Sequence, residues 1–255
     1  MRTFIIIQLI SLSLLCVGQT DSLRYISIDD ALQLALQHNP TALNDAARKA
    51  LIRDVKSTYY HLVLVDQKMK ILRDQLNLIG DLRRVARLRY ETGDIDLLEK
   101  TILVSRLNDV STSASVLSDE MAILRNQLKI HLFEIQDLYP ADTVLTMYKI
   151  NKDAPPADPR PADTDDYSAF VSDLTLENLK YTLNVSFKKL RHFETFALET
   201  SGLMLDTAKT RLQKEEIDYC EFIELVDSAF AIKLEYLDTL DKYNQTAIQL
   251  EFYAY

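Results

Sequence analysis

The chain has 255 residues, of which 47% are hydrophobic and only four are glycine. So few glycines are unusual for a compact mixed fold and suit long helices, which need few turns. The net charge of −9 argues against a nucleic-acid partner, because binding to phosphates requires a basic surface.

Residues 1–18 have the pattern of a secretory signal peptide. Arg2 supplies the positive end, and an apolar run extends from Phe4 to Val17. This run is too short for a comfortable transmembrane helix. Small residues precede Gln19 at the positions that a signal peptidase reads. We therefore expect an exported protein.

Two cysteines leave two questions open. Acylation of Cys16, as in a lipoprotein, is an alternative to simple cleavage, although Leu15 is a poor fit to the small residue expected before it. Cleavage leaves Cys220 without a second cysteine, which excludes a disulfide within the chain. We expect Cys220 to be a small packing residue in a helix.

Residues 19–40 form an N-terminal segment with one short helix. Ser27 is placed to cap this helix, and Asp29 and Asp30 follow in the first turn, where the helix dipole favours negative charge. Asn39-Pro40 ends it, because the residue before a proline is pushed out of the α region.

Residues 41–138 are predicted to form one long helical hairpin, with the first helix running from about Thr41 to Tyr90. Hydrophobic residues recur every seven positions, which is the pattern of a coiled-coil seam. The rows are Val65, Leu72, Ile79 and Ala86, and Met69, Leu76, Arg83 and Tyr90. The returning helix, expected to end near Asp137, carries Leu103, Val110, Leu117 and Leu124, and Leu107, Ala114, Met121 and Leu128. Gly93 lies between the two helices, where a glycine lets the chain reverse.

Residues 139–172 are rich in proline and aspartate and are predicted to be a linker that no helix can cross. Its prolines are Pro140, Pro155, Pro156, Pro159 and Pro161. Within it, Thr143 to Ile150 has a strand-like composition that favours one short strand.

Residues 173–255 repeat the first hairpin. The stretch that begins at Arg89 recurs 122 residues later at Arg211, and one ungapped register holds from Tyr59 opposite Tyr181 to Leu128 opposite Leu250. Such a register is typical of an internal repeat. We therefore expect two hairpins of one design, whose tips are marked by Gly93 and Glu215. Polar residues interrupt the last seam at Lys233, Asp241 and Asn244 and are expected to face water or a neighbouring element.

Three motifs in this order resemble the TolC-like outer-membrane efflux proteins. They are the short helix from Ser27 that ends at Asn39-Pro40, the pattern Arg89-Tyr90-x-x-Gly93-Asp94-Ile95, and the second copy of that pattern from Arg211. The resemblance covers most of the mature chain. It implies an exported component, in the outer membrane or at its periplasmic face, of a tripartite efflux system that moves small molecules or metal ions out of a Gram-negative type envelope.

The resemblance also implies partners and a site. In that family a periplasmic adaptor protein docks on the hairpin tips, an inner-membrane pump completes the system, and three copies assemble. The tip residues here are Arg89, Tyr90, Gly93, Asp94, Ile95, Arg211, Glu215, Glu216, Ile217 and Asp218.

The family's subunits also contribute strand pairs to a membrane barrel, and this sequence has no room for them. No tandem segments of alternating apolar and polar residues are present. The predicted fold is therefore all-α, with two antiparallel long-helix coiled-coil hairpins, a short N-terminal helix and no complete β-barrel. The alternative function is a periplasmic helical scaffold or binding protein derived from the family, with no channel of its own.

No pattern in the sequence points to catalysis. The four histidines are scattered without a second ligand at helical spacing, and no glycine-rich phosphate loop is present. We expect no enzyme activity, cofactor or metal site. The acidic residues near 215–218 are best explained as the start of a helix.

Aromatic residues are spread round the second hairpin, which predicts self-association, with a trimer as the resemblance implies. They are Phe187, Phe193, Phe196, Tyr236 and Tyr243.

Overall fold

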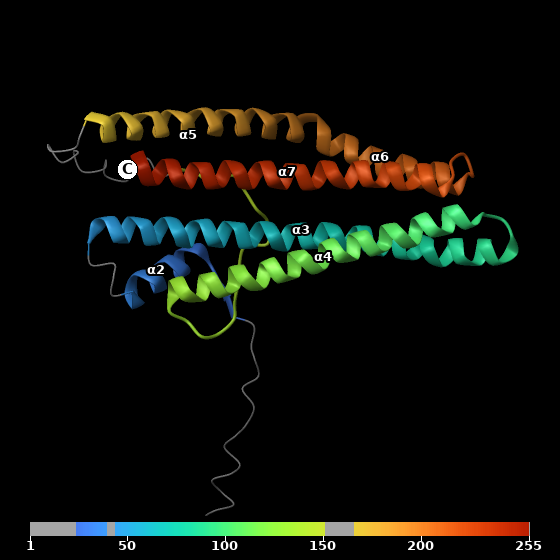
Figure 1. Cartoon of the computed structure of the whole chain (residues 1–255), viewed down its shortest axis with the longest axis horizontal. Coiled ribbons are helices and arrows are strands. Elements are labelled where there is room, and N and C mark those ends of the chain that lie inside the picture. Colours follow the sequence, from blue (N-terminus) through green and yellow to red (C-terminus); the bar gives the residue numbers. More distant parts are fainter. Residues whose placement is uncertain (1–23, 40–43, 151–165, 255) are drawn as a thin grey trace, which may run out of the picture.

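The computed structural model of the chain describes residues 24–39, 44–150 and 166–254 (Figure 1). In these ranges it is all-α, as predicted, apart from two very short strands. The elements are β1 Arg24–Ile26, α2 Ile28–His38, α3 Asp45–Thr92, α4 Leu97–Leu132, β2 Leu138–Pro140, α5 Asp166–His192, the π-helix η1 Phe193–Ala197, α6 Leu198–Gln213 and α7 Tyr219–Ala254. The predicted signal peptide, residues 1–18, lies outside the described residues.

Two antiparallel hairpins lie side by side. α3 and α4 form the first, while α5, η1 and α6 run along α7 to form the second (Figure 1). α3 and α7 are the inner helices and contact each other, whereas α4 and α5 lie outermost. Both hairpins reverse at the same end of the molecule. The short helix α2 packs on α3 and α4 at the other end.

The helix ends follow local capping chemistry. The Ser27 hydroxyl accepts the Asp30 N–H at 3.1 Å, which confirms the predicted cap of α2, and Asn44 caps α3 in the same way. α4 ends at Leu132 rather than near Asp137, because Phe133 takes a left-handed conformation with φ 55°. α5 begins at Asp166, inside the stretch predicted to be linker. The last proline of that stretch is Pro161, so no proline interrupts a helix that begins after it.

The predicted seam residues of the first hairpin face the core, except Arg83, which is exposed. In α3 the row from Val65 to Ala86 is buried throughout, and in α4 Leu103, Val110 and Leu128 meet it. One apolar cluster surrounds Tyr59 and Leu128 at the end that carries α2. A second cluster joins both hairpins toward the tips. This burial is what holds such long helices in place, because isolated helices are only marginally stable.

The segment from Thr143 to Ile150 forms no strand, contrary to the prediction. Its backbone groups bond instead to a side chain of α7: Asn244 accepts the Tyr148 N–H at 2.7 Å and donates to the Thr146 carbonyl at 2.9 Å. Asn244 is fully buried, so this seam-breaking residue binds the crossing segment rather than water. The short strand β2 pairs in parallel with β1, and the sequence did not predict either of them.

The π-helix η1 was not predicted from the sequence, and it resolves a mismatch in the seam of the second hairpin. The buried positions up to the first residue of η1 are Ser186, Leu190 and Phe193, and those after η1 are Ser201, Leu205 and Ala208. Each later residue lies fifteen positions beyond its counterpart, one more than two heptads. A π-turn accommodates one extra residue, so the buried residues of both α5 and α6 stay packed against α7.

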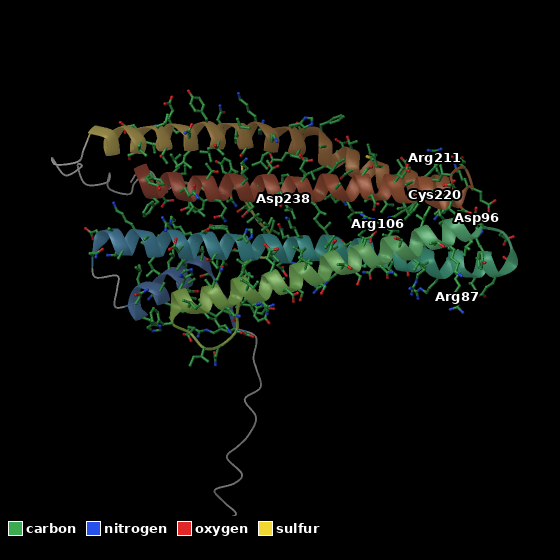
Figure 2. All side chains as sticks on the ribbon, viewed as in Figure 1. Arg87, Asp96, Arg106, Arg211, Cys220 and Asp238 are labelled. Carbon is green, nitrogen blue, oxygen red and sulfur yellow. The ribbon has the colours of Figure 1, made fainter. Side chains whose placement is uncertain are left out.

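Polar side chains line the contact between the hairpins. α3 contributes mostly cations and α7 mostly carboxylates. Lys56 Nζ lies 2.8 Å from Glu251 Oε1, and the two side chains are only 14% and 15% exposed. Nearer the tips, Arg106 of α4, which is labelled in Figure 2, and Gln75 of α3 donate to one oxygen of Asp227 at 2.7 and 3.0 Å. The hairpins are therefore joined by ion pairs as well as by apolar packing.

Candidate functional site

The first hairpin reverses at Gly93, as predicted. Gly93 has φ 83°, a left-handed conformation that glycine adopts without steric cost. The Asp94 N–H donates to the Arg89 carbonyl at 2.8 Å, and the Gly93 N–H donates to the Tyr90 carbonyl at 3.1 Å. This pair of bonds is the Schellman arrangement that satisfies the last carbonyls of a helix.

The second hairpin reverses in the same way at Glu215. The Glu216 N–H donates to the Arg211 carbonyl at 2.9 Å, and the Glu215 N–H donates to the Leu212 carbonyl at 3.0 Å. Both bonds lie 122 residues after their counterparts at the first tip. Glu215 has φ 58°, so a side chain occupies a position that glycine would fill without strain.

The helices that leave the two tips also begin alike. Asp96 accepts the Glu99 N–H at 2.9 Å and Glu99 reaches back to Asp96, which together form a capping box. Asp218 accepts the Glu221 N–H at 2.8 Å. The acidic residues at 215–218 thus include a helix cap, as the sequence predicted. Glu216 is exposed and lies 3.9 Å from both Arg211 and Lys214.

The two tips touch each other. Arg89 Nη2 donates to Glu215 Oε1 at 2.8 Å across the hairpins, and the Tyr219 N–H donates to Glu99 at 3.4 Å. Hydrogen bonds to Tyr219 and Glu215 raise the pKa of Arg89 above its ordinary value. The tips therefore form one joined surface at the end of the molecule, with Asp96 and Arg211 both near it in Figure 2.

The predicted tip residues divide into exposed and packed ones. Ile217 is buried and Ile95 half-buried in the cluster that joins the hairpins, so neither is a protruding contact. Tyr90 is half-buried beneath the Lys100 ammonium, 4.2 Å from its ring centre. Asp94 and Glu216 are exposed.

Exposed apolar side chains surround the first tip and were missed from the sequence. They are Val85, Leu88, Leu97 and Leu98, of which Leu88 and Leu98 are 63% and 62% exposed. The sequence signal for these exposed residues was the pair Leu97-Leu98 directly after the helix cap. The two leucines precede Leu103, the first residue of the seam of α4, so the seam does not account for them. Their exposure gives the joined tips an apolar rim.

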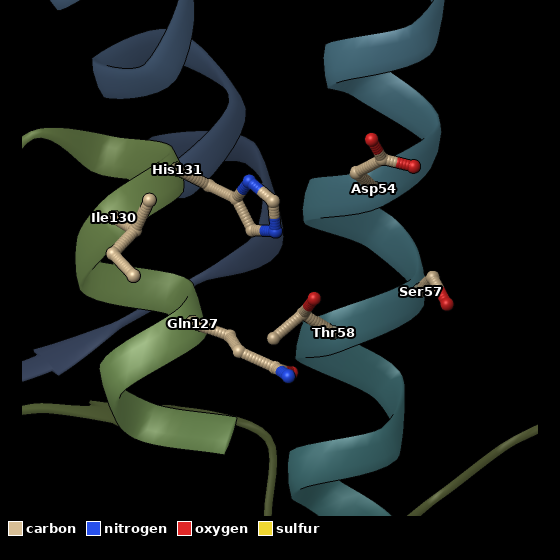
Figure 3. Close-up of a pocket in the computed structure, with 6 residues that line it drawn as sticks. All are labelled: Asp54, Ser57, Thr58, Gln127, Ile130 and His131. Carbon is tan, nitrogen blue, oxygen red and sulfur yellow. The ribbon is translucent and has the colours of Figure 1, made fainter. Parts of the chain in front are cut away.

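A polar pocket of about 360 Å³ lies between α3 and α4, away from the tips (Figure 3). It is lined by Asp54, Ser57, Thr58, Gln127, Ile130 and His131. Burial lowers the pKa of His131, and the nearby Asp54 partly offsets this. Ser57 turns away from His131 and donates to Gln245 on α7, so these side chains do not form a serine–histidine pair.

Within the described ranges we also searched for side chains that could bind a metal and for reactive thiols. No group of three or more histidine, cysteine, aspartate and glutamate side chains there is arranged to hold a metal ion. Cys220 is half-buried, and burial raises the pKa of its thiol. None of the helices in the described part of the chain combines the length and apolarity needed to cross a membrane.

Comparison with known proteins defines the fold but not a family. No protein-family model matches the sequence, and no curated protein matches it significantly. The structure is similar to a crystal structure of a membrane protein from Pseudomonas aeruginosa, with a TM-score of 0.65 and 11% sequence identity. The match covers 89% of this chain and 72% of that one. At this identity the likeness concerns the arrangement of helices.

Proposed function

We propose that this chain is an exported component of an efflux system of the TolC-like outer-membrane type, moving small molecules or metal ions out of the cell. The observation that carries the proposal is the pair of helix reversals with matching hydrogen bonds at one end of the molecule. These reversals place the exposed polar side chains of Asp94 and Glu216 at the end of the molecule, together with an apolar rim at Leu88 and Leu98. A helical hairpin arriving end-on finds both kinds of contact there.

The partner proposed for the joined tips is a periplasmic adaptor protein, linked in turn to an inner-membrane pump. The resemblance of the tip sequences to the efflux family supports this choice. The helical likeness to a Pseudomonas aeruginosa membrane protein supports a place at an envelope membrane. The proposed role is to bind other proteins of the efflux system, and it requires neither a cofactor nor a catalytic group.

We further propose that copies of the chain associate, as a trimer. Exposed apolar residues lie on the outer face of α5–α6 and on that of α4, the two outermost helices. On α5–α6 they are Val171, Leu174, Tyr181, Val185, Phe196 and Leu203, and on α4 they are Val116, Ile123 and Ile130 at heptad spacing. Of the aromatic residues predicted to be exposed, Phe187 and Phe196 are exposed, Tyr236 and Tyr243 are half-buried, and Phe193 is buried.

The two outer faces complement each other in size and charge. Between Val104 and Asn126 the exposed face of α4 consists largely of serine and other small residues, and its exposed charges are Asp109 and Asp119. Between Lys180 and Arg191 the exposed face of α5 carries aromatic side chains and only positive charges. Opposite edges that fit each other favour head-to-tail contacts, which close into rings.

Fractionation of the cell envelope tests the proposal. The full chain, expressed with its own leader, is expected to sediment with the outer membrane and to remain there after washing with concentrated salt. Release of the whole population as a soluble periplasmic protein would instead identify the helical scaffold or binding protein that is the alternative. A gene neighbourhood that encodes an adaptor and a pump would favour the efflux role.

A further inference from the structure

His61 lies where three long helices meet. It projects from α3 between α4 and α7, and both of its ring nitrogens face carboxylates. Nδ1 lies 3.1 Å from Asp241 Oδ2 on α7, and Nε2 lies 3.1 Å from Glu120 Oε1 on α4. One imidazole ring thus connects the second hairpin to the outer helix of the first.

The geometry requires a charged ring. An ionised carboxylate can only accept hydrogen bonds, so each ring nitrogen must carry a hydrogen to bond its partner. Neutral imidazole has one N–H, whereas imidazolium has two. Loss of the proton would place a nitrogen lone pair against a carboxylate oxygen.

The other charges near His61 are already engaged. On α7, Asp241 also accepts from Gln245 at 3.2 Å, and Asp238 pairs with Lys68, two turns further along α3. On α4, Glu120 is the charged side chain that faces the ring. Both carboxylates raise the pKa of His61, with the hydrogen bond to Asp241 contributing most and burial opposing them.

We propose that His61 is a pH-operated tie between the two hairpins, which as imidazolium holds Glu120 and Asp241 together and as neutral imidazole releases one of them. Glu120 is the carboxylate that is released. Its side chain is 40% exposed and can be solvated by water, whereas that of Asp241 is 14% exposed and fixed by Gln245. This tie does not depend on the proposed efflux function.

The direction of the pH effect follows from the pKa shift. The pKa of His61 is raised in the folded chain, so its stabilisation is complete below the unfolded-state pKa of about 6.5 and disappears as the pH rises through the folded value. The tie is therefore closed in acid and open in alkali. His131 has a lowered pKa and works in the opposite direction, so wild-type chain must be compared with a variant of His61 alone.

Thermal unfolding of the full chain across this pH range tests the tie, with His61→Gln as the neutral variant and His61→Lys as the permanently charged one. The melting temperature of wild type should exceed that of His61→Gln most below about pH 6, and the difference should shrink above about pH 8. The difference between His61→Lys and His61→Gln should vary little with pH over the same range. His192→Gln, which removes an exposed histidine at the end of α5, is the matched control and should not reproduce the loss seen in His61→Gln.

NMR of the imidazole nitrogens in the full chain provides a second readout that does not depend on the variants folding. Both His61 nitrogens should be protonated in acid, and Nδ1 alone should keep its hydrogen after titration. In Glu120→Gln the pKa of His61 should fall, while the contact to Asp241 persists. A wild-type advantage over His61→Gln that is the same at all pH values, or a neutral ring in acid, would overturn the proposal.

Discussion

At the scale of single residues, the two tips show how one backbone shape accepts different side chains. Gly93 and Glu215 both take the left-handed conformation and make matching hydrogen bonds. For a residue with a Cβ atom this conformation costs roughly 1–2 kcal/mol. Glu215 offsets part of that cost through its ion pair with Arg89, although exposed pairs contribute little. The second tip therefore carries local strain that the first does not.

Replacing Glu215 with glycine tests this strain. We expect Glu215→Gly to raise the free energy of unfolding by roughly 0.5–1 kcal/mol, because relief of the left-handed conformation exceeds the loss of the ion pair and the added freedom of the unfolded chain. Glu215→Ala loses the same ion pair but keeps the strain, so it serves as the matched control. Urea denaturation measures both. An alanine variant as stable as the glycine variant would show that relief of the left-handed conformation does not exceed the added freedom of the unfolded chain.

At the scale of elements, the long helices and their seams could be predicted because a heptad pattern records which face of a helix is covered. Both reversals could be predicted from Gly93 and the repeat. The π-helix could not, because one extra residue between two good seams looks like ordinary variation. The partners of Asn244 and the joining of His61 to Glu120 and Asp241 depend on how the hairpins pack together, which no local pattern encodes.

The π-helix explanation predicts that one residue can be removed from η1. Deleting Thr195, which is exposed, would leave the buried positions of α5 and α6 in one continuous heptad pattern, so we expect stability within about 1 kcal/mol of wild type. Deleting Asp74, an exposed residue in the regular part of α3, should turn half of that seam away from the core and cost several kcal/mol. Calorimetry on both deletions decides the matter. Equal losses would refute the account of η1.

The ion pairs between α3 and α7 give a further prediction. Lys56→Met should lower the free energy of unfolding by about 3 kcal/mol, because it leaves the largely buried carboxylate of Glu251 without its cation. Lys70→Met removes an exposed pair with Asp66 within one helix and should cost less than about 0.5 kcal/mol. Urea denaturation measures the two losses, and similar values would mean that the hairpin contact gains nothing from its charges.

At the scale of the whole molecule, the outer faces of α4 and α5–α6 are the proposed contacts between copies. Tyr181→Glu places a negative charge in the aromatic face of α5, which is proposed to meet the acidic face of α4. We expect it to shift the chain toward the monomer in sedimentation at micromolar concentration. Tyr25→Glu changes an equally exposed tyrosine of β1, outside the face of α5, and is the control. A wild-type chain that sediments as a clean monomer would contradict the proposed association.

The proposed role of the joined tips is tested most directly by the affinity of the full chain for the proposed periplasmic adaptor protein. Leu98→Glu changes an exposed tip residue, and Ile135→Glu changes a residue that is 94% exposed in the segment after the other end of α4. Neither side chain is packed, so both variants should melt within a few degrees of wild type. We predict that Leu98→Glu weakens adaptor binding at least tenfold, about 1.4 kcal/mol, while Ile135→Glu binds as wild type does. Equal adaptor affinity for the wild-type chain and both variants would contradict docking at the tips.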